Sequence, residues 1–195
     1  MSWRMTNLSA RQFWWECMLR QFRTVAFDAL PHYEFPPIAP EKLQQIVLPK
    51  PLEFFVMIKP SGLPKEAAIR KLIAQSGLTI SREETYHNFF EIAAHIFRID
   101  KIHDYRYALP EGYIWLRLLE HFYPQACQQM KVLYIQDSNE RALKRLKTHI
   151  RRKIGVEFYR VRIQGTQMVT CMTPVHTSDE ATLEQETRIL RYFHP

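Results

Sequence analysis

The spacing of hydrophobic residues along this chain changes several times, and each change marks an expected element. Two short, continuously apolar runs, at residues 54–58 and 131–135, are typical of strands that are covered on both faces. Weaker patterns predict further strands at residues 78–83, 156–163 and 167–172. Apolar residues recur every three or four positions in helices expected at residues 65–76, 89–97, 113–123, 138–154 and 182–193. Residues 98–112, rich in charge and closed by Pro110 and Gly112, are expected to form a loop.

The first 53 residues follow a different pattern. Residues 9–30 have helical apolar spacing with many aromatic side chains, Ser9 is a suitable N-cap, and Pro31 follows. Prolines at positions 36, 37, 40, 49 and 51 then disfavour regular structure, apart from a short helical turn near residues 41–46. We therefore expect three parts: an amphipathic helix within residues 1–30, a proline-rich strap at 31–53, and one domain at 54–195. The helix is expected to pack on this domain or on a second subunit.

Strands and helices interleaved in this order predict an α+β protein with helices on a small sheet. If the four main strands pair antiparallel, the arrangement is the ferredoxin-like βαββαβ sandwich with an added N-terminal helix. Periodicity alone leaves the pairing open.

The chain carries 27 Lys and Arg residues against 20 Asp and Glu residues, a net charge of +7 that predicts anionic partners without choosing among them. Its three cysteines are scattered, with no spacing that suits zinc, as expected for a reduced, cytoplasmic protein. No apolar run is long enough to span a bilayer, and the N-terminus lacks the pattern of a secretory signal.

Two segments far apart in sequence carry candidate chemistry. Lys59 ends the apolar run at 54–58 and could meet a phosphate, although a solvated lysine is the commoner case. His176 lies between an expected strand and the last helix, and a neutral imidazole is a good nucleophile near pH 7. Ser178 could donate to a phosphate oxygen or cap the helix. A carboxylate on that helix, Glu184 or Glu186, could orient the imidazole.

The helix expected after Ser138, its predicted N-cap, has an almost wholly basic outer face. Its cations, with two more on the next strand, are Arg141, Lys144, Arg145, Lys147, Arg151, Arg152, Lys153, Arg160 and Arg162. So many like charges repel one another unless an anion lies nearby. Arginine could hold a di- or triphosphate, and an exposed basic helix could equally follow a nucleic-acid backbone. Tyr113 and Trp115 could stack on a base in either case.

From residue 54 to its end, the chain resembles the nucleoside diphosphate kinase family. That family has a first strand ending in Ile-Lys-Pro, here Ile58-Lys59-Pro60, and a catalytic His-Gly-Ser-Asp motif before the last helices, here His176-Thr177-Ser178-Asp179. The two motifs occur in the same order. The family also places one arginine in a helix after a central strand and a second further on, matched here by Arg145 and, with a one-residue shift, by Arg162. An asparagine three residues before the histidine is Thr173 here.

The resemblance implies a ferredoxin-like core and a phosphotransferase that exchanges the γ-phosphate between nucleoside tri- and diphosphates through a phosphohistidine. It implies His176 as nucleophile with Glu186 and Ser178 as catalytic partners, and magnesium held through the nucleotide phosphates. It further implies nucleotide binding by Lys59, Arg145, Arg162 and Tyr113, to which the basic helix adds Arg151. Two alternatives stay open: a catalytically inactive module of the same fold that binds nucleotide or nucleic acid, and an assembly role of the N-terminal helix in a homo-oligomer.

Overall fold

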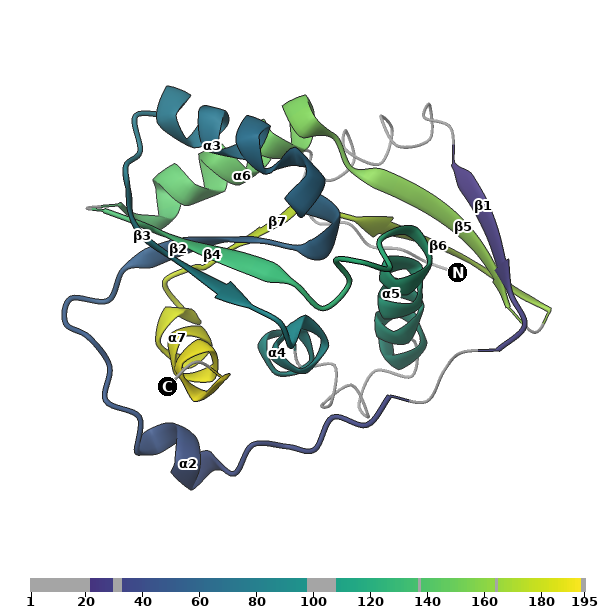
Figure 1. The fold of residues 1–195 in the computed structure, drawn as a ribbon, viewed down its shortest axis with the longest axis horizontal. Helices are drawn as coiled ribbons and strands as arrows, with labels where there is room; N and C mark the ends of the chain where they lie inside the picture. Colours follow the sequence, from purple (N-terminus) through teal and green to yellow (C-terminus); the bar gives the residue numbers. More distant parts are fainter. Residues whose placement is uncertain (1–21, 30–32, 98–107, 137, 164, 194–195) are drawn as a thin grey trace.

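The computed structural model describes residues 22–29, 33–97, 108–136, 138–163 and 165–193. These residues form two β-sheets with helices packed around them, which confirms the α+β class (Figure 1). The predicted helix at residues 9–30 lies mostly outside the described residues.

The larger sheet holds four strands in the order β3-β4-β2-β7. These are β3 Ile80–Tyr86, β4 Met130–Ile135, β2 Phe54–Ile58 and β7 Val175–Thr177. Each neighbouring pair is antiparallel, with Met57 opposite His176 and Val56 opposite Leu133. The strands expected near 54–58, 78–83 and 131–135 are confirmed, whereas the three-residue β7 was not expected.

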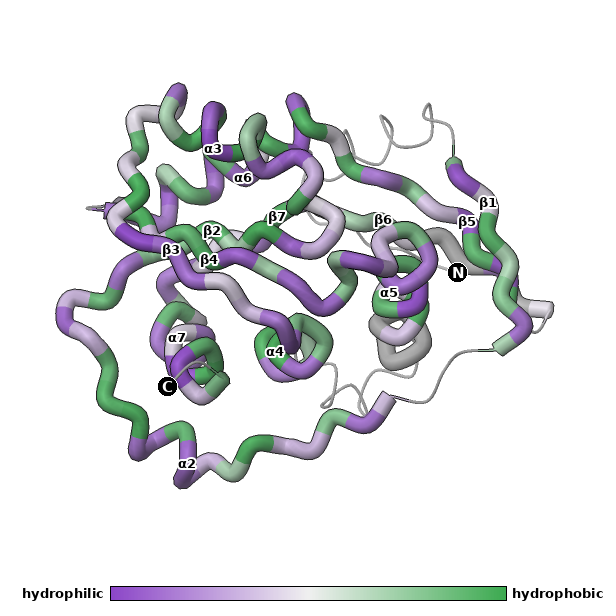
Figure 2. The backbone as a smooth tube through the Cα atoms, viewed as in Figure 1, coloured by the Kyte–Doolittle hydropathy of each residue, from purple (hydrophilic) through white to green (hydrophobic). Residues whose placement is uncertain are grey.

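Helices cover both faces of this sheet (Figure 1). The helices α3 Glu66–Gln75 and α6 Glu140–Ile154 lie on one face; α4 Phe89–Ile96 and α7 Leu183–Phe193 lie on the other. Strand β2 is apolar at every position because Val56 and Ile58 pack towards α3 and α6, while Phe55 and Met57 pack the opposite way. Figure 2 shows α4 as largely hydrophobic, as expected for a helix that is buried over most of its surface.

The second sheet joins β1 Arg23–Phe27, β5 Glu157–Ile163 and β6 Thr166–Met172, in that order. Strand β1 runs parallel to β5, and β6 runs antiparallel to it. The helix predicted for residues 9–30 is therefore wrong at residues 23–27. Val25 and Phe27 are buried while Thr24 and Ala26 are exposed, which is the two-residue alternation of a strand. The strand is stabilised by hydrogen bonds to the edge of β5.

From residue 33 the strap runs along the outside of α4 and α7 to β2, with the short helix α2 Pro40–Gln44 on the way (Figure 1). Tyr33 stacks on Phe35 and packs on Tyr113 of α5, the helix Ala108–Phe122. Further along, Arg188 of α7 donates from Nη1 to the carbonyls of Leu43 and Ile46, at 2.9 and 2.8 Å. The strap is thus fixed to the helical layer at two points.

Two local predictions need correction. Helix α5 begins at Ala108, so Pro110 and Gly112 lie inside its first turns and not in a loop. A proline fits there because the first amides of a helix have no partner within the helix. The N-cap of α6 is Asn139, whose Oδ1 accepts from the Ala142 amide at 3.0 Å; the Ser138 hydroxyl does not cap the helix.

Among the described residues, no helix combines the length and the apolar character needed to cross a membrane.

Candidate functional site

The end of β2 and the beginning of β7 lie against each other. The Lys59 amide donates to the Pro174 carbonyl at 3.0 Å, directly after the cross-strand pair of Ile58 and Val175. Gly62 packs so closely here that a Cβ on it would lie 2.2 Å from the Pro174 oxygen, so only glycine fits. The fold therefore brings together the two segments that the sequence singled out.

His176 is held in one orientation by a carboxylate. Its Nε2 lies 3.0 Å from Oε2 of Glu186, and the two side chains are 14% and 6% exposed. The other carboxylate oxygen, Oε1, accepts from the Thr182 hydroxyl at 2.8 Å. Because an ionised carboxylate can only accept, the imidazole proton lies on Nε2, and Nδ1 keeps its lone pair.

Lys59 ends in an unusual environment for an ammonium group. Its Nζ donates to Oγ1 of Thr173 at 3.2 Å and lies 4.8 and 4.9 Å from the ring centres of Phe97 and Trp115. Phe97 also packs edge-on against the His176 ring, with the ring centres 5.2 Å apart. One aromatic side chain, Phe97, thus contacts both the lysine and the histidine.

Burial lowers the pKa of both groups. The pKa of Lys59 falls to about 7, first because the ammonium is desolvated and then because Lys147 and Arg151 of α6 repel its charge. Burial also lowers the pKa of His176 below its usual value; Glu186 opposes this shift, while Lys59 and Lys147 add to it. At neutral pH His176 is therefore uncharged, as a nucleophilic imidazole must be.

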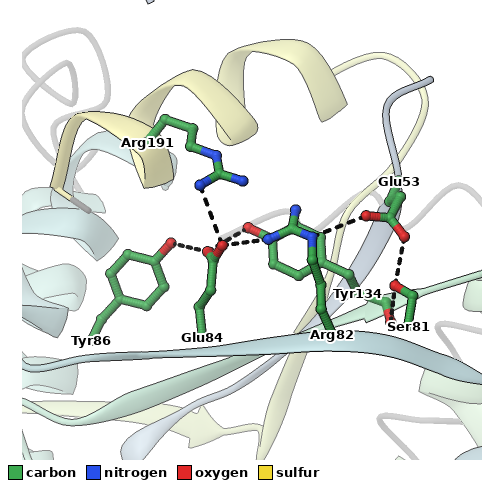
Figure 3. A network of polar contacts seen from close by, with 7 residues as sticks. All are labelled: Glu53, Ser81, Arg82, Glu84, Tyr86, Tyr134 and Arg191. Atoms are coloured by element: carbon green, nitrogen blue, oxygen red, sulfur yellow. Dashed lines mark hydrogen bonds and ion pairs between the residues drawn. The ribbon is translucent and has the colours of Figure 1, made fainter. Parts of the chain in front are cut away.

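Helix α7, which carries Glu186, is fixed to the sheet by a polar network (Figure 3). Arg191 of α7 points at Glu84 of β3, with its Nη1 3.4 Å from the carboxylate. Glu84 also accepts from the hydroxyls of Tyr86 and Tyr134, at 2.7 and 2.8 Å. Burial alone would raise the pKa of Glu84, but these hydrogen bonds and the charges of Arg191 and Arg82 lower it overall, so Glu84 is ionised and paired with both arginines.

Other predicted site residues close to His176 are engaged elsewhere. Ser178 is 1% exposed; its Oγ accepts from the Phe55 amide at 2.9 Å, which locks β7 onto β2. Glu184 is 64% exposed and pairs with Arg188, so Glu186 is the carboxylate that contacts the imidazole.

Besides Lys59, only one of the residues predicted to bind phosphate or nucleotide, Arg151, acts on the site around Lys59; the others are exposed or packed elsewhere. Arg151 is half-buried and acts on Lys59 electrostatically. Arg145 lies on the exposed face of α6, and Arg162 is exposed on β5, opposite Gln167 of β6. The Tyr113 hydroxyl donates to the Tyr33 carbonyl at 3.3 Å, so this ring packs on the strap. These roles remain predictions.

Two residues of the site were not assigned to it from the sequence. Lys147 was assigned only to the basic face of α6, and Phe97 was expected only as the end of a helix. A signal for Lys147 was present, because it follows Leu143 by four residues and must share the side of the helix on which that buried leucine lies. No comparable signal marks Phe97, whose contacts join residues distant in sequence.

No protein-family model matches this chain, and neither does any of the curated proteins compared with it. The case for a function therefore rests on the sequence motifs and on the geometry described above.

Proposed function

We propose that the chain is a phosphotransferase that moves the γ-phosphate between nucleoside tri- and diphosphates through a phosphohistidine at His176. One observation carries the proposal: the His176 Nε2 is held by the buried Glu186 carboxylate at 3.0 Å, next to a lysine within electrostatic reach. A carboxylate that fixes one ring nitrogen and leaves the other free is the arrangement expected of an activated imidazole nucleophile.

In the proposed first step, the Nδ1 lone pair attacks the terminal phosphorus. An N–P bond forms, the bond from that phosphorus to the bridging oxygen breaks, and the diphosphate leaves. The Nε2 proton remains shared with Glu186, whose negative charge stabilises the imidazolium. In the second step a terminal oxygen of another diphosphate attacks, and the N–P bond breaks. Phe97 packs edge-on against the His176 ring and so forms part of the wall of the proposed site.

Magnesium enters this scheme with the substrate. No group of three or more His, Cys, Asp or Glu side chains within the described part of the chain could hold a metal ion. Two further cations, Lys147 and Arg151, act electrostatically on Lys59, and their charges would repel a metal. As the family resemblance implies, magnesium would be held by the phosphates of the nucleotide, where it neutralises part of their charge.

We also propose that the core is ferredoxin-like, and the strand order supports this. In β2-α3-β3-β4-α6-β7 the strands follow the order β7-β2-β4-β3 across an antiparallel sheet, and both helices lie on one face. This arrangement corresponds to a split βαβ unit repeated once.

The proposal is tested with radiolabelled γ-phosphate ATP, magnesium and an acceptor diphosphate. We expect label on the wild-type protein that is lost in acid, stable in base and transferred to the acceptor. His176→Ala should lose essentially all transfer, since the covalent route has no other nucleophile. His149→Ala, on the outer side of α6, serves as the matched control and should keep it. Wild-type rates in His176→Ala, or no label on wild type, would refute the proposal.

A separate observation favours the alternative of a nucleic-acid-binding module. On the exposed face of α6, none of Arg141, Arg145 and Arg152 forms an ion pair with another described residue. They line a shallow depression of about 610 Å³. If no label appears, while an oligonucleotide binds with an affinity that falls steeply with salt and depends on these arginines, this alternative takes the place of the first.

A further inference from the structure

Three cations are carried by the end of β2 and by α6, and α6 packs against both β2 and β7, the strand that holds His176. Lys59 comes from the end of β2; Lys147 and Arg151, four residues apart, extend from the same side of α6. Lys147 and Arg151 both act to lower the pKa of Lys59, and Arg151 does the same to Lys147 after the larger effect of burial. The three positive charges therefore repel one another electrostatically.

The positive charge of this cluster has little compensation within the protein. None of the three cations forms an ion pair with a carboxylate of the described residues, and the nearby Glu186 is already bonded to His176. The Nε of Arg151 is buried without a hydrogen-bond partner, and Lys59 is only 8% exposed. Like charges that are buried or partly buried, together with an unused buried donor, are unfavourable unless a ligand supplies the missing negative charge and acceptor.

We propose that Lys59, Lys147 and Arg151 form a binding site for a tetrahedral dianion, which in the reaction is the terminal phosphoryl group that His176 attacks. The inference rests on the proposed function for that choice of substrate, and it assigns the phosphate contacts to different residues. Arg145 and Arg162, which the family resemblance suggests, are exposed, whereas Lys147 and Arg151 are partly buried and act on Lys59 electrostatically.

The site has a second property, which is that anion binding takes up a proton. Without a ligand, Lys59 has a pKa of about 7 and is mostly neutral at pH 8. A dianion beside it favours the ammonium form, so binding at pH 8 should protonate Lys59. The other charged or titratable groups that act on the lysine and its neighbours are Lys144, Lys147, Arg151, Cys171, His176, Asp179 and Glu186. Of these, His176 has a lowered pKa and stays neutral at pH 8, so it does not supply the uptake.

Sulfate is the suitable probe because it stays dianionic across this pH range. Any proton that is taken up on binding must therefore bind to the protein and not to the sulfate. The full-length protein is titrated with sulfate by calorimetry at pH 8, in two buffers of different ionisation enthalpy, with chloride held constant. We expect one site and the uptake of up to about one proton. Lys147→Gln and Arg151→Gln should each weaken binding by about tenfold, as expected for a lost charged hydrogen bond. Lys59→Met should abolish the proton uptake.

The matched controls are Arg145→Gln and Arg152→Gln, which remove the same charge from the exposed face of the same helix. They should leave sulfate affinity within about twofold of the wild type. Lys147→Arg keeps the charge and should retain binding, which separates loss of a ligand from loss of the fold. Equal weakening by inner and outer substitutions, or no proton uptake at pH 8, would overturn the inference.

The outcome is distinguishable from failure of phosphotransfer. If sulfate binds with the expected pattern to wild type and to His176→Ala, but wild type takes up no label, the anion site is supported and the phosphotransferase proposal is refuted. If Lys147→Gln and Arg151→Gln are labelled and transfer phosphate normally, the phosphotransferase proposal is supported and the assignment of the anion site to these residues is refuted.

Discussion

Lys59 is the residue at which burial and charge conflict most directly. Its ammonium is enclosed by two rings and repelled by two cations, and its pKa falls to about 7. In the unfolded chain the same group titrates near its usual value, about three units higher. Between these two values the unfolded state binds more protons than the folded state, so the free energy of unfolding rises with pH through this window. Below pH 7 the folded protein carries the full cost of the buried charge.

Lys59→Met should therefore stabilise the protein at pH 6. The change that it causes in the free energy of unfolding should be more favourable at pH 6 than at pH 9.5 by on the order of 3 kcal/mol. The variant removes a buried charge and keeps a side chain of similar size. Urea unfolding at both pH values measures the difference. Lys71→Met, an exposed lysine on α3, should show no such pH dependence. A stability difference between Lys59→Met and wild type that is the same at pH 6 and pH 9.5 would contradict the account of this lysine.

At the scale of elements, α7 determines where Glu186 lies, and the strap is fixed to α7 by one side chain. Nη1 of Arg188 donates to the carbonyls of Leu43 and Ile46 at the end of α2, a helix without buried residues of its own. Arg188→Ala should thus lower the free energy of unfolding by about 1 to 2 kcal/mol and expose the strap to proteases. Urea unfolding and timed proteolysis measure the two effects.

Glu184→Ala is the control for Arg188. It removes the exposed carboxylate that pairs with Arg188 and leaves the bonds to the strap carbonyls. We expect it to change stability by less than about 0.5 kcal/mol, as is usual for an exposed ion pair. If both variants expose the strap equally, the carbonyl contacts are not what fixes it.

The elements that the sequence predicted well are those with strong local patterns. Strands β2 and β4 and helix α6 have apolar runs or stripes long enough to specify their type. Strand β1 could not be predicted in this way, because its helical spacing is overruled by the free edge of β5. Strand β7 has only three residues, too few for any periodicity, and it forms because β2 offers a partner.

The site was predictable from the sequence only where a strong local pattern marked its residues. His176 and Lys59 stood out because each lies at the junction of an apolar run and a turn or helix. The choice between Lys147 and Arg145 depends on how α6 is rotated about its axis against the sheet, which only the packing of Leu143, Leu146 and Ile150 decides. Ser178 looked like a catalytic donor, yet its hydroxyl is taken by the Phe55 amide.

At the scale of the whole molecule, the site exists only where four elements meet. Lys59 directly follows β2, while β7 supplies His176, α6 supplies Lys147 and Arg151, and α7 supplies Glu186. The helices α6 and α7 lie on opposite faces of the sheet, so the site joins the two layers at the strand edge (Figure 1). One face of α6 thus serves this site, while the opposite, exposed face carries the remaining cations.

The most direct measurement is to locate the phosphoryl group after incubation with ATP and magnesium. Phosphorus NMR of the labelled protein distinguishes phosphate on Nδ1 from phosphate on Nε2 of a histidine, and peptide mapping identifies the residue. Because Glu186 holds Nε2 at 3.0 Å, we predict a single phosphohistidine at His176 with phosphate on Nδ1. Phosphate on Nε2, on another residue, or on none would contradict the account.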